Sequence, residues 1–228
     1  MYAHIKCTQP HLPEQALTNQ DLCDGSTGWS PEKILLKTGI AERRIAADSE
    51  TALDLGVEAG LKLLSTHPQI KDKIDYLIFC TQTPDHFLPS GACIIQNRLG
   101  LKQSIGAIDI NQGCSGFVYA LSVAKGLIAG RIAKNVLVIT ADTYTKLINA
   151  KDVSVRTLFG DGACAALIEA SSEPGGIGSF VFGTDGSGSE SLIVPAGAFR
   201  TPSSDTTAVE TVDPFGNTRS QEQLFMDG

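Results

Sequence analysis

The 228-residue sequence predicts a layered α/β fold. Short apolar runs, typical of strands that are buried on both faces, alternate along the chain with longer segments that have helical spacing of apolar residues. This alternation favours a mainly parallel sheet with helices on its faces, joined by right-handed crossovers. Hydrophobic residues make up 42% and charged residues 19% of the chain, which is enough apolar surface for a large core.

Five nearly continuous apolar runs predict the strands, and capping residues followed by apolar stripes predict four helices. The predicted strands cover residues 74–80, 105–110, 135–141, 163–169 and 179–184. The predicted helices cover residues 31–37, 50–65, 90–99 and 114–129. The last helix is apolar nearly all round, with Tyr119, Ser122 and Lys125 as its polar side chains beyond the first turn. We therefore expect it to be buried on most sides.

Composition and charge exclude several classes of function. The net charge of −7 and the lack of a basic run argue against a general nucleic-acid-binding protein. The N-terminus has no apolar core of a secretory signal, and no apolar run approaches the roughly 20 residues that span a bilayer. The six cysteines are scattered without metal-ligand spacing. We expect a cytoplasmic, acidic globular protein with reduced thiols and no metal site.

The stretch DINQGCSGF, residues 109–117, places a cysteine where a predicted strand turns into a helix. The N-terminus of a helix offers free backbone N–H groups and the positive end of the helix dipole, which stabilise a thiolate. Gly113 and Gly116 allow a sharp bend and a close approach of substrate to the backbone. Cys114 is therefore a candidate nucleophile for covalent acyl transfer. The alternative is a small buried residue that closes the turn.

The segment from DINQGCSGF to residue 130 resembles the active-site segment of the β-ketoacyl-acyl carrier protein synthase III family, within the thiolase-like superfamily. Other segments resemble this family in the same order along the chain. They are LPEQALTN (12–19), KTGIAERRIA (37–46), LFGDGACAALIEA (158–170), DGSGSESLIVPAG (185–197) and LFMDG (224–228). The resemblance covers essentially the whole chain.

The resemblance implies a thiolase-like α/β/α/β/α sandwich, of which this chain holds the first βαβ repeat. Residues 1–170 would form that repeat with the nucleophile, and residues 171–228, rich in Gly, Ser, Thr and Pro, would form a loop-rich connection. In the family, the connection leads into a second repeat, which this sequence lacks. We expect that the chain is the N-terminal part of a longer enzyme, because half of such a fold leaves a large apolar surface exposed.

The reaction that the resemblance implies is a decarboxylative Claisen condensation. Cys114 would be acylated by an acyl-CoA, and malonyl-acyl carrier protein would then lose CO₂ and attack the acyl-enzyme to give a β-ketoacyl product. No cofactor is implied, since acyl-CoA and malonyl-acyl carrier protein are substrates. The implied partners are the acyl carrier protein and a second copy of the chain in a homodimer, in fatty acid or related lipid and polyketide synthesis.

Further site residues follow from the resemblance, position by position. Phe159, Met226, Gly228 and Leu88 match the acyl and pantetheine channel, and Leu88 would reach into the neighbouring subunit. Lys37 and Arg156 match the region of the CoA phosphates. Phe159, Leu88 and Met226 could equally be core residues, and Lys37 could equally be a solvated helix end.

Two departures from the family affect this picture. Where the family has the tryptophan that stacks on adenine, this chain has Lys33, and its single tryptophan is Trp29; the arginine on the other side of the adenine falls on Val153. The acyl donor could therefore be another thioester, such as a carrier-bound one.

All four histidines precede Cys114, whereas the family's catalytic histidine and asparagine lie in its C-terminal half. His86 is the one candidate to take the place of the family's catalytic histidine. Two alternatives stay open: an enzyme that transfers acyl groups without condensation, and a non-catalytic half-domain that binds acyl chains or a catalytic partner.

Overall fold

The structure, a computed structural model, describes residues 1–23 and 28–227. Its contacts divide the chain into two compact units that interleave along the sequence. Unit 1 comprises Met1–Pro13, Ala46–Asp142 and Asp161–Val181, and unit 2 comprises Glu14–Ile45, Thr143–Gly160 and Phe182–Gly228. The boundary that the sequence predicts at residue 170 divides a βαβ repeat from a loop-rich connection. It is not a prediction of two compact units, and it stays a prediction.

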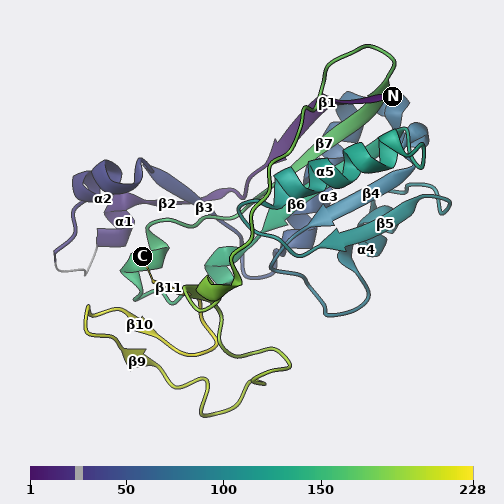
Figure 1. Ribbon diagram of the computed structural model, residues 1–228. Coiled ribbons are helices and arrows are strands. Elements are labelled where there is room, and N and C mark those ends of the chain that lie inside the picture. Colours follow the sequence, from purple (N-terminus) through teal and green to yellow (C-terminus); the bar gives the residue numbers. More distant parts are fainter. Residues whose placement is uncertain (24–27, 228) are drawn as a thin grey trace. The chain divides into compact units, whose positions relative to one another are not determined.

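Unit 1 contains a five-stranded mixed sheet (Figure 1). Its strands are β1 (Tyr2–His11), β4 (Tyr76–Cys80), β5 (Gly106–Ile110), β6 (Asn135–Asp142) and β7 (Gly162–Ser171). Their order is β1-β7-β6-β4-β5, with β6, β4 and β5 parallel and β7 antiparallel to both β6 and β1. Cys80 pairs with Ile110 and Thr140, so the three parallel strands end together. We call this end of the sheet the carboxyl edge.

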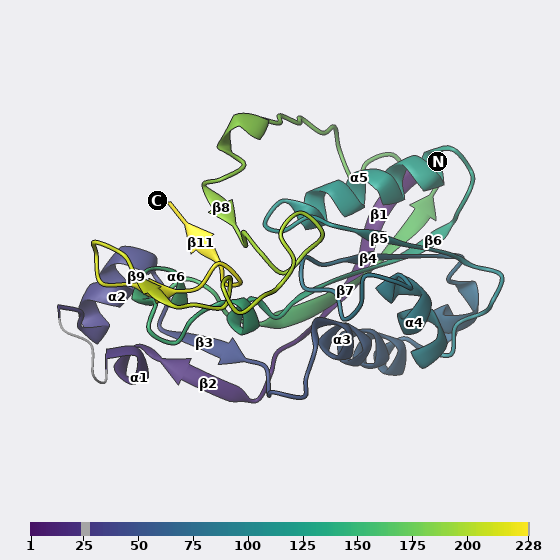
Figure 2. The ribbon, with the colours of Figure 1, turned by 90° about the horizontal axis from the view of Figure 1, so that it is seen from below.

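Helices cover both faces of this sheet (Figure 2). Helices α3 (Ala52–Thr66) and α4 (Gly91–Arg98) pack on one face, and α5 (Gly116–Ala129) packs on the other. The short 3₁₀ helix η1 (Pro68–Lys73) leads from α3 into β4. Thr51 and Asp54 begin α3 with a capping box, in which each side chain binds the other residue's backbone N–H. The predicted layered α/β fold is thus confirmed.

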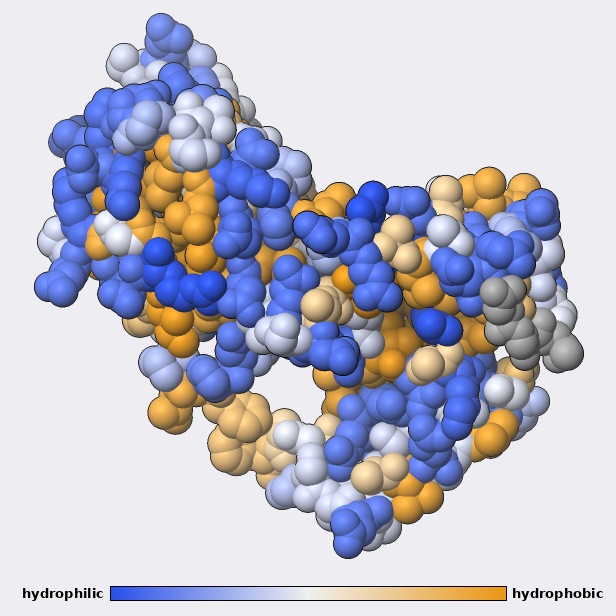
Figure 3. All heavy atoms as spheres, turned by 180° about the vertical axis from the view of Figure 1, so that it is seen from behind, coloured by the Kyte–Doolittle hydropathy of each residue, from blue (hydrophilic) through white to orange (hydrophobic). Residues whose placement is uncertain are grey.

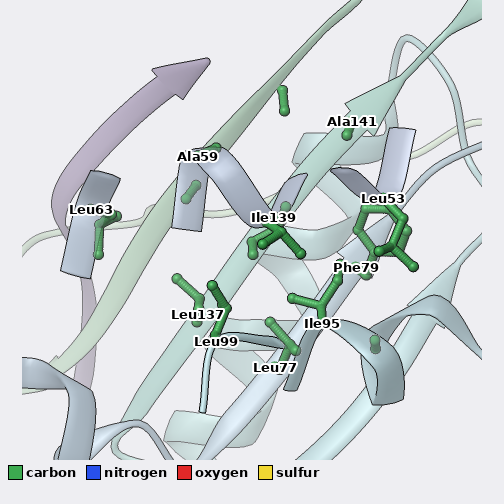
Figure 4. Packing of buried hydrophobic residues seen from close by; sticks show 14 of the residues in the cluster. Leu53, Ala59, Leu63, Leu77, Phe79, Ile95, Leu99, Leu137, Ile139 and Ala141 are labelled. Atoms are coloured by element: carbon green, nitrogen blue, oxygen red, sulfur yellow. The ribbon is translucent and has the colours of Figure 1, made fainter. Parts of the chain in front are cut away.

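The alternation of side chains along the strands supplies two separate cores. Phe79 and Ile139 point toward α3 and α4, whereas Ile78 and Val138 point toward α5. On the α3 side, leucine and isoleucine side chains from the helices interdigitate with the leucine, isoleucine and phenylalanine side chains of β4 and β6 (Figure 4). The apolar runs of the sequence are therefore buried on both faces, as predicted for β4 and β6.

The outer surface is mainly polar on the side shown in Figure 3, where blue areas of hydrophilic residues surround smaller orange areas of hydrophobic residues. Within the described residues, no helix has the length and apolar character needed to cross a membrane. All six cysteines are unpaired.

Two expectations for unit 1 are wrong. Residues 179–184 form no strand; instead Phe180 packs against the core beside α5, and Val181 is 98% exposed. Nζ of Lys125 on α5 lies 5.6 Å from the centroid of the Phe180 ring, so one side chain of the run packs beside a helix, which a strand-like run of letters does not distinguish from a strand.

The helix expected to be buried on most sides is buried on one. Gly116, Ala120 and Ala124 face the sheet, whereas Phe117 and Val118 are 36% and 47% exposed. The reason is that, among the described residues, the second face of α5 has no sheet packed against it.

Unit 2 has short elements and no large sheet in its described part. Its helical elements are α1 (Asn19–Cys23), α2 (Pro31–Thr38), η2 (Tyr144–Leu147), α6 (Val153–Arg156) and η3 (Gly186–Gly188). Its strands form three antiparallel pairs: β2 (Gln15–Thr18) with β3 (Glu42–Ile45), β8 (Leu192–Ile193) with β11 (Phe225–Met226), and β9 (Thr211–Val212) with β10 (Thr218–Arg219). Helix α2 matches its prediction, and β2 lies within the segment LPEQALTN.

Arg43 organises unit 2 from within. Its buried guanidinium donates to the carbonyl oxygen of Thr157, at 2.9 Å from Nε, and to Oδ1 of Asn19, at 2.6 Å from Nη1. Burial lowers the pKa of Arg43 below its usual value. A Cβ atom on Gly160 would lie 3.1 Å from Cβ of Arg43. The segments KTGIAERRIA and LFGDGACAALIEA, distant in sequence, therefore pack against each other here.

Candidate active site

Cys114 lies at the carboxyl edge, on the turn that joins β5 to α5. The backbone N–H of Gly116 donates to the carbonyl oxygen of Gly113 at 2.7 Å, which closes the turn around Cys114. The helix begins at Gly116, two residues later than predicted, so Cys114 precedes the helix rather than lying on its face. Cys114 is exposed to solvent. A strand that leads into a helix at the carboxyl edge of parallel strands is a common place for a binding site.

The N-terminus of α5 has no side-chain cap. Ser115 occupies the N-cap position, but its side chain makes no capping hydrogen bond and donates to Oε1 of Gln112 at 3.4 Å. The first backbone N–H groups of a helix lack partners inside the helix, and here no side chain takes them. The positive end of the helix dipole is therefore open beside Cys114, as needed to stabilise a thiolate or an oxyanion.

A second cysteine supports this turn from behind. The buried thiol of Cys80 donates to the carbonyl oxygen of Gln112 at 3.3 Å. A Cβ atom on Gly116 would lie only 2.4 Å from Sγ of Cys80, so residue 116 must be glycine for the helix to pack this closely. Burial raises the pKa of Cys80 to about 11. Cys80 is thus a packing residue with a thiol that stays protonated at neutral pH.

An acidic side chain ends the adjacent strand at the same edge. Oδ1 of Asp142 accepts three hydrogen bonds, from the backbone N–H of Gln82 at 2.7 Å and from the hydroxyls of Thr81 and Thr83 at 3.1 Å each. Burial raises the pKa of Asp142, and these hydrogen bonds oppose that rise. Among the described residues, no cluster of His, Cys, Asp and Glu could hold a metal ion.

The remaining site residues proposed from sequence are divided between the units. Leu88 lies in unit 1, on the loop between β4 and α4, where its side chain is 81% exposed; His86 is exposed on the same loop. Phe159, Arg156 and Met226 lie in unit 2. Gly228 lies outside the described residues. Cys114 and Leu88 thus lie in unit 1, whereas Phe159, Arg156 and Met226 lie in unit 2.

Within unit 2, each of the three has a defined environment. The ring of Phe159 stacks on that of Tyr144, with centroids 5.2 Å apart. Arg156 donates from Nη1 to the carbonyl oxygen of Ala150 at 3.0 Å. Met226 is half-buried on β11. These contacts fit either a channel wall or a local core.

Trp29 and two lysines lie together, although the tryptophan is four positions away from the family's place. The Nζ atoms of Lys33 and Lys37 lie 5.1 and 5.4 Å from the centroid of the Trp29 ring. They come from successive turns of α2, which follows Trp29 directly. Two ammonium groups beside an aromatic ring can bind a phosphate-bearing aromatic ligand.

Sequence reasoning missed Cys80, Asp142 and Arg43. Cys80 ends a predicted strand and Arg43 lies within the segment KTGIAERRIA, but the sequence assigns no role to either of them or to Asp142. One signal was present: polar residues come directly after the apolar runs of two parallel strands, at Thr81 and at Asp142. Such residues meet at one edge of a parallel sheet.

Comparisons with known proteins agree on one family. Its sequence model, described as 3-Oxoacyl-[acyl-carrier-protein (ACP)] synthase III, matches residues 108–186. A beta-ketoacyl-[acyl-carrier-protein] synthase III of Caldanaerobacter subterraneus subsp. tengcongensis is 41% identical over 227 residues, which are 99% of this chain and 65% of that protein. The chain therefore spans slightly less than two thirds of the length of this curated relative.

Solved structures match both the sequence and the fold. A crystal structure of a 3-oxoacyl-(acyl-carrier-protein) synthase III is 52% identical with a TM-score of 0.95, and the match covers 100% of this chain and 68% of that chain. A 3-oxoacyl-(acyl-carrier protein) synthase from Burkholderia xenovorans is 36% identical with a TM-score of 0.85, over 100% of this chain and 63% of that one. The thiolase-like fold is thus confirmed, and the chain belongs to the 3-oxoacyl-(acyl-carrier-protein) synthase III family.

Proposed function

We propose that the protein to which this chain belongs is an acyltransferase that forms an acyl-enzyme on Cys114 and condenses it with malonyl-acyl carrier protein. The observation that carries the proposal is the exposed Cys114 beside the uncapped N-terminus of α5. The names of the relatives, which describe synthesis of a 3-oxoacyl group on acyl carrier protein, support the choice of reaction.

In the first step, the thiolate of Cys114 attacks the thioester carbonyl carbon of an acyl-CoA. The carbonyl electrons move onto oxygen, where the backbone N–H of Cys114 supplies half of the oxyanion hole. When the carbonyl re-forms, the CoA sulfur leaves with the electron pair of the broken C–S bond and takes up a proton. The acyl group is then held on Cys114.

In the second step, the malonyl group of malonyl-acyl carrier protein loses CO₂. The electron pair of the broken C–C bond stays on the α-carbon, which attacks the acyl carbonyl of the acyl-enzyme. Cys114 leaves as the thiolate, and the product is a β-ketoacyl-acyl carrier protein. No cofactor takes part in either step.

The donor is proposed to bind through its nucleotide. Lys33 and Lys37 would face the CoA phosphates and Trp29 its base, which is supported by their mutual contacts on α2. Arg156 is a further proposed phosphate ligand. In this assignment an aromatic ring still contacts the base, but the ring is that of Trp29, four positions before the family's tryptophan.

The acyl chain and pantetheine arm are proposed to contact Phe159, Met226, Gly228 and Leu88. The high exposure of Leu88 supports its insertion into the neighbouring subunit of a homodimer. With acyl-CoA and acyl carrier protein as substrates, the reaction would take place in the cytoplasm.

The test is intact mass spectrometry of the full-length protein to which this chain belongs, after incubation with a panel of acyl-CoAs. We expect one acyl adduct, absent from Cys114→Ser and retained in Cys93→Ser, which removes the other exposed thiol. If the wild-type chain gains no adduct, or if Cys114→Ser keeps it, the proposal is wrong. Because the family's catalytic histidine and asparagine lie in its C-terminal half, malonyl-acyl carrier protein is then added to the full-length protein, where it separates condensation, which yields a β-ketoacyl product, from simple acyl transfer.

A further inference from the structure

The turn that carries Cys114 is held by a neighbouring stretch of chain, Cys80–Thr83, which we call the 80–83 segment. On the side of the turn, the backbone N–H of Thr81 donates to the carbonyl oxygen of Ile110 at 3.1 Å. The thiol of Cys80 donates to the carbonyl oxygen of Gln112, and Gly116 packs against its sulfur. Through Cys80 and Thr81, the segment thus contacts both ends of the turn, at Ile110 and at Gly116.

On its other side, the 80–83 segment is fixed by one carboxylate oxygen. Oδ1 of Asp142 accepts from a backbone N–H and two hydroxyls of the segment, and the Thr83 N–H also donates to the Thr81 hydroxyl at 3.0 Å. Thr81 is buried. The segment therefore lies between the end of β6 and the nucleophile turn, with directional contacts to both.

We propose that Asp142 is a positioning residue for Cys114, which acts through the 80–83 segment to hold the nucleophile turn against the N-terminus of α5. The role of Cys114 as nucleophile rests on the proposed function, whereas the positioning itself concerns the reactivity of its thiol. If Asp142 loses its carboxylate, the segment loses three hydrogen bonds to one acceptor oxygen at once, and the turn loses its support.

The choice of an acid here fits a positioning role better than a purely stabilising one. A half-buried carboxylate is disfavoured by loss of hydration, which is the main cause of the raised pKa of Asp142. Its three donors all bind one oxygen, so they define the location of the segment closely. Polar groups arranged in this way can increase the uniqueness of a local structure at some expense of stability.

The chain offers a matched control at the opposite edge of the same sheet. Asp75 precedes β4 and accepts hydrogen bonds from the backbone N–H groups of Lys134 and Asn135, at 3.0 to 3.2 Å. It is half-buried, as is Asp142. Loss of either carboxylate breaks several hydrogen bonds in unit 1, but the Asp75 bonds lie at the amino ends of the parallel strands.

The experiment measures alkylation of the 228-residue chain by iodoacetamide, resolved by residue with peptide mass spectrometry. The rate at Cys114 is divided by the rate at Cys93, an exposed thiol on α4 that serves as an internal reference. We expect Asp142→Ala to lower this ratio between about 10-fold and 100-fold, as for a misplaced reactive group. Asp75→Ala should leave the ratio within about twofold, whatever its effect on melting temperature.

Asp142→Asn should retain most of the reactivity, because its amide oxygen can accept the same three hydrogen bonds. If Asp142→Ala does not fold, Thr81→Val replaces it, since this variant removes one donor with little change of shape. An unchanged ratio in the folded alanine variant, or in Thr81→Val, would overturn the proposal, as would an equal drop in Asp75→Ala. The readout is independent of acyl transfer, so a chain that gains no acyl adduct but shows the predicted ratios contradicts only the proposed function.

Discussion

The two faces of the unit 1 sheet differ in what they bury and in what they leave open. On the α3 side, large side chains such as Phe79, Leu137 and Ile139 are sealed beneath two helices. On the α5 side, the helix buries glycine and alanine together with Leu121 and Ile128, and its outer residues Phe117 and Val118 are exposed. The α3 face of the sheet therefore buries most of the apolar side chains, whereas the α5 face carries the turn with Cys114.

The largest effect on stability is expected on the α3 side. Phe79→Ala removes a fully buried ring and should lower the free energy of unfolding by about 3–5 kcal/mol. Phe117→Ala removes the same group from a partly exposed position and should lower it by less than about 1 kcal/mol. Urea denaturation followed by circular dichroism measures both. Equal losses would show that the two faces are not distinct.

The next effect joins stability to reactivity at the base of α5. Gly116→Ala places a methyl group on the sulfur of Cys80 and should lower the free energy of unfolding by about 1–3 kcal/mol. It should also slow alkylation of Cys114, because the turn must move. Removing the sulfur in the double variant Gly116→Ala, Cys80→Ala should restore both properties. Strictly additive effects of the two changes would contradict this packing.

A smaller effect is expected from the charge of Asp142. Burial raises the folded-state pKa of this acid above its ordinary value of 3.8, so the folded state binds the proton more tightly than the unfolded state. The free energy of unfolding should therefore fall as pH rises from about 3.8 through the folded pKa.

Asp142→Asn removes this contribution, because its side chain does not titrate. Relative to the wild type, the variant should gain stability across the same pH window and keep that gain at neutral pH. Urea unfolding at several pH values between 3 and 8 measures the difference. A stability difference between variant and wild type that does not grow in favour of the variant across this window would contradict the raised pKa.

The smallest effect is expected on the outer side of α5. Val118→Ser should change the free energy of unfolding by less than about 0.5 kcal/mol, because the side chain already contacts water. The matched change Val136→Ser, on β6 and fully buried, should lower it by about 2 kcal/mol or more. If Val118→Ser is as damaging as Val136→Ser, the outer side of α5 is covered in solution.

The elements that the sequence predicted well are those whose pattern and environment agree. Strands β4 and β6 are apolar runs buried on both faces, and α3 has both a capping box and an apolar stripe. Strand β1 does not read as an apolar run, because it contains polar residues such as Lys6 and Gln9. It is an edge strand, and most of its residues are exposed or only partly buried. The run at 179–184 was misread because packing against a helix and pairing in a sheet require the same residue types.

The candidate site divides in the same way. The place of Cys114 between a strand and a helix could be predicted, because glycines and an abrupt change in pattern mark such a turn locally. The support by Cys80 and Asp142 could not, since both meet the turn through contacts between strands far apart in sequence. The start of α2 could be predicted, but the grouping of Trp29 with Lys33 and Lys37 also depends on how the Trp29 ring lies against the two lysines, which spacing alone does not reveal.

The strand order of unit 1 has a consequence for how the chain folds during synthesis. Strand β1 leaves the ribosome first, yet it pairs with β7, where Ala3 meets Ala170. Because β7 lies between β1 and β6, the sheet cannot close until almost the last residue of the unit has been made. Contacts of such long sequence separation slow folding. Until β7 arrives, β1 and β6 present unpaired strand edges, and such edges can pair with other chains and aggregate.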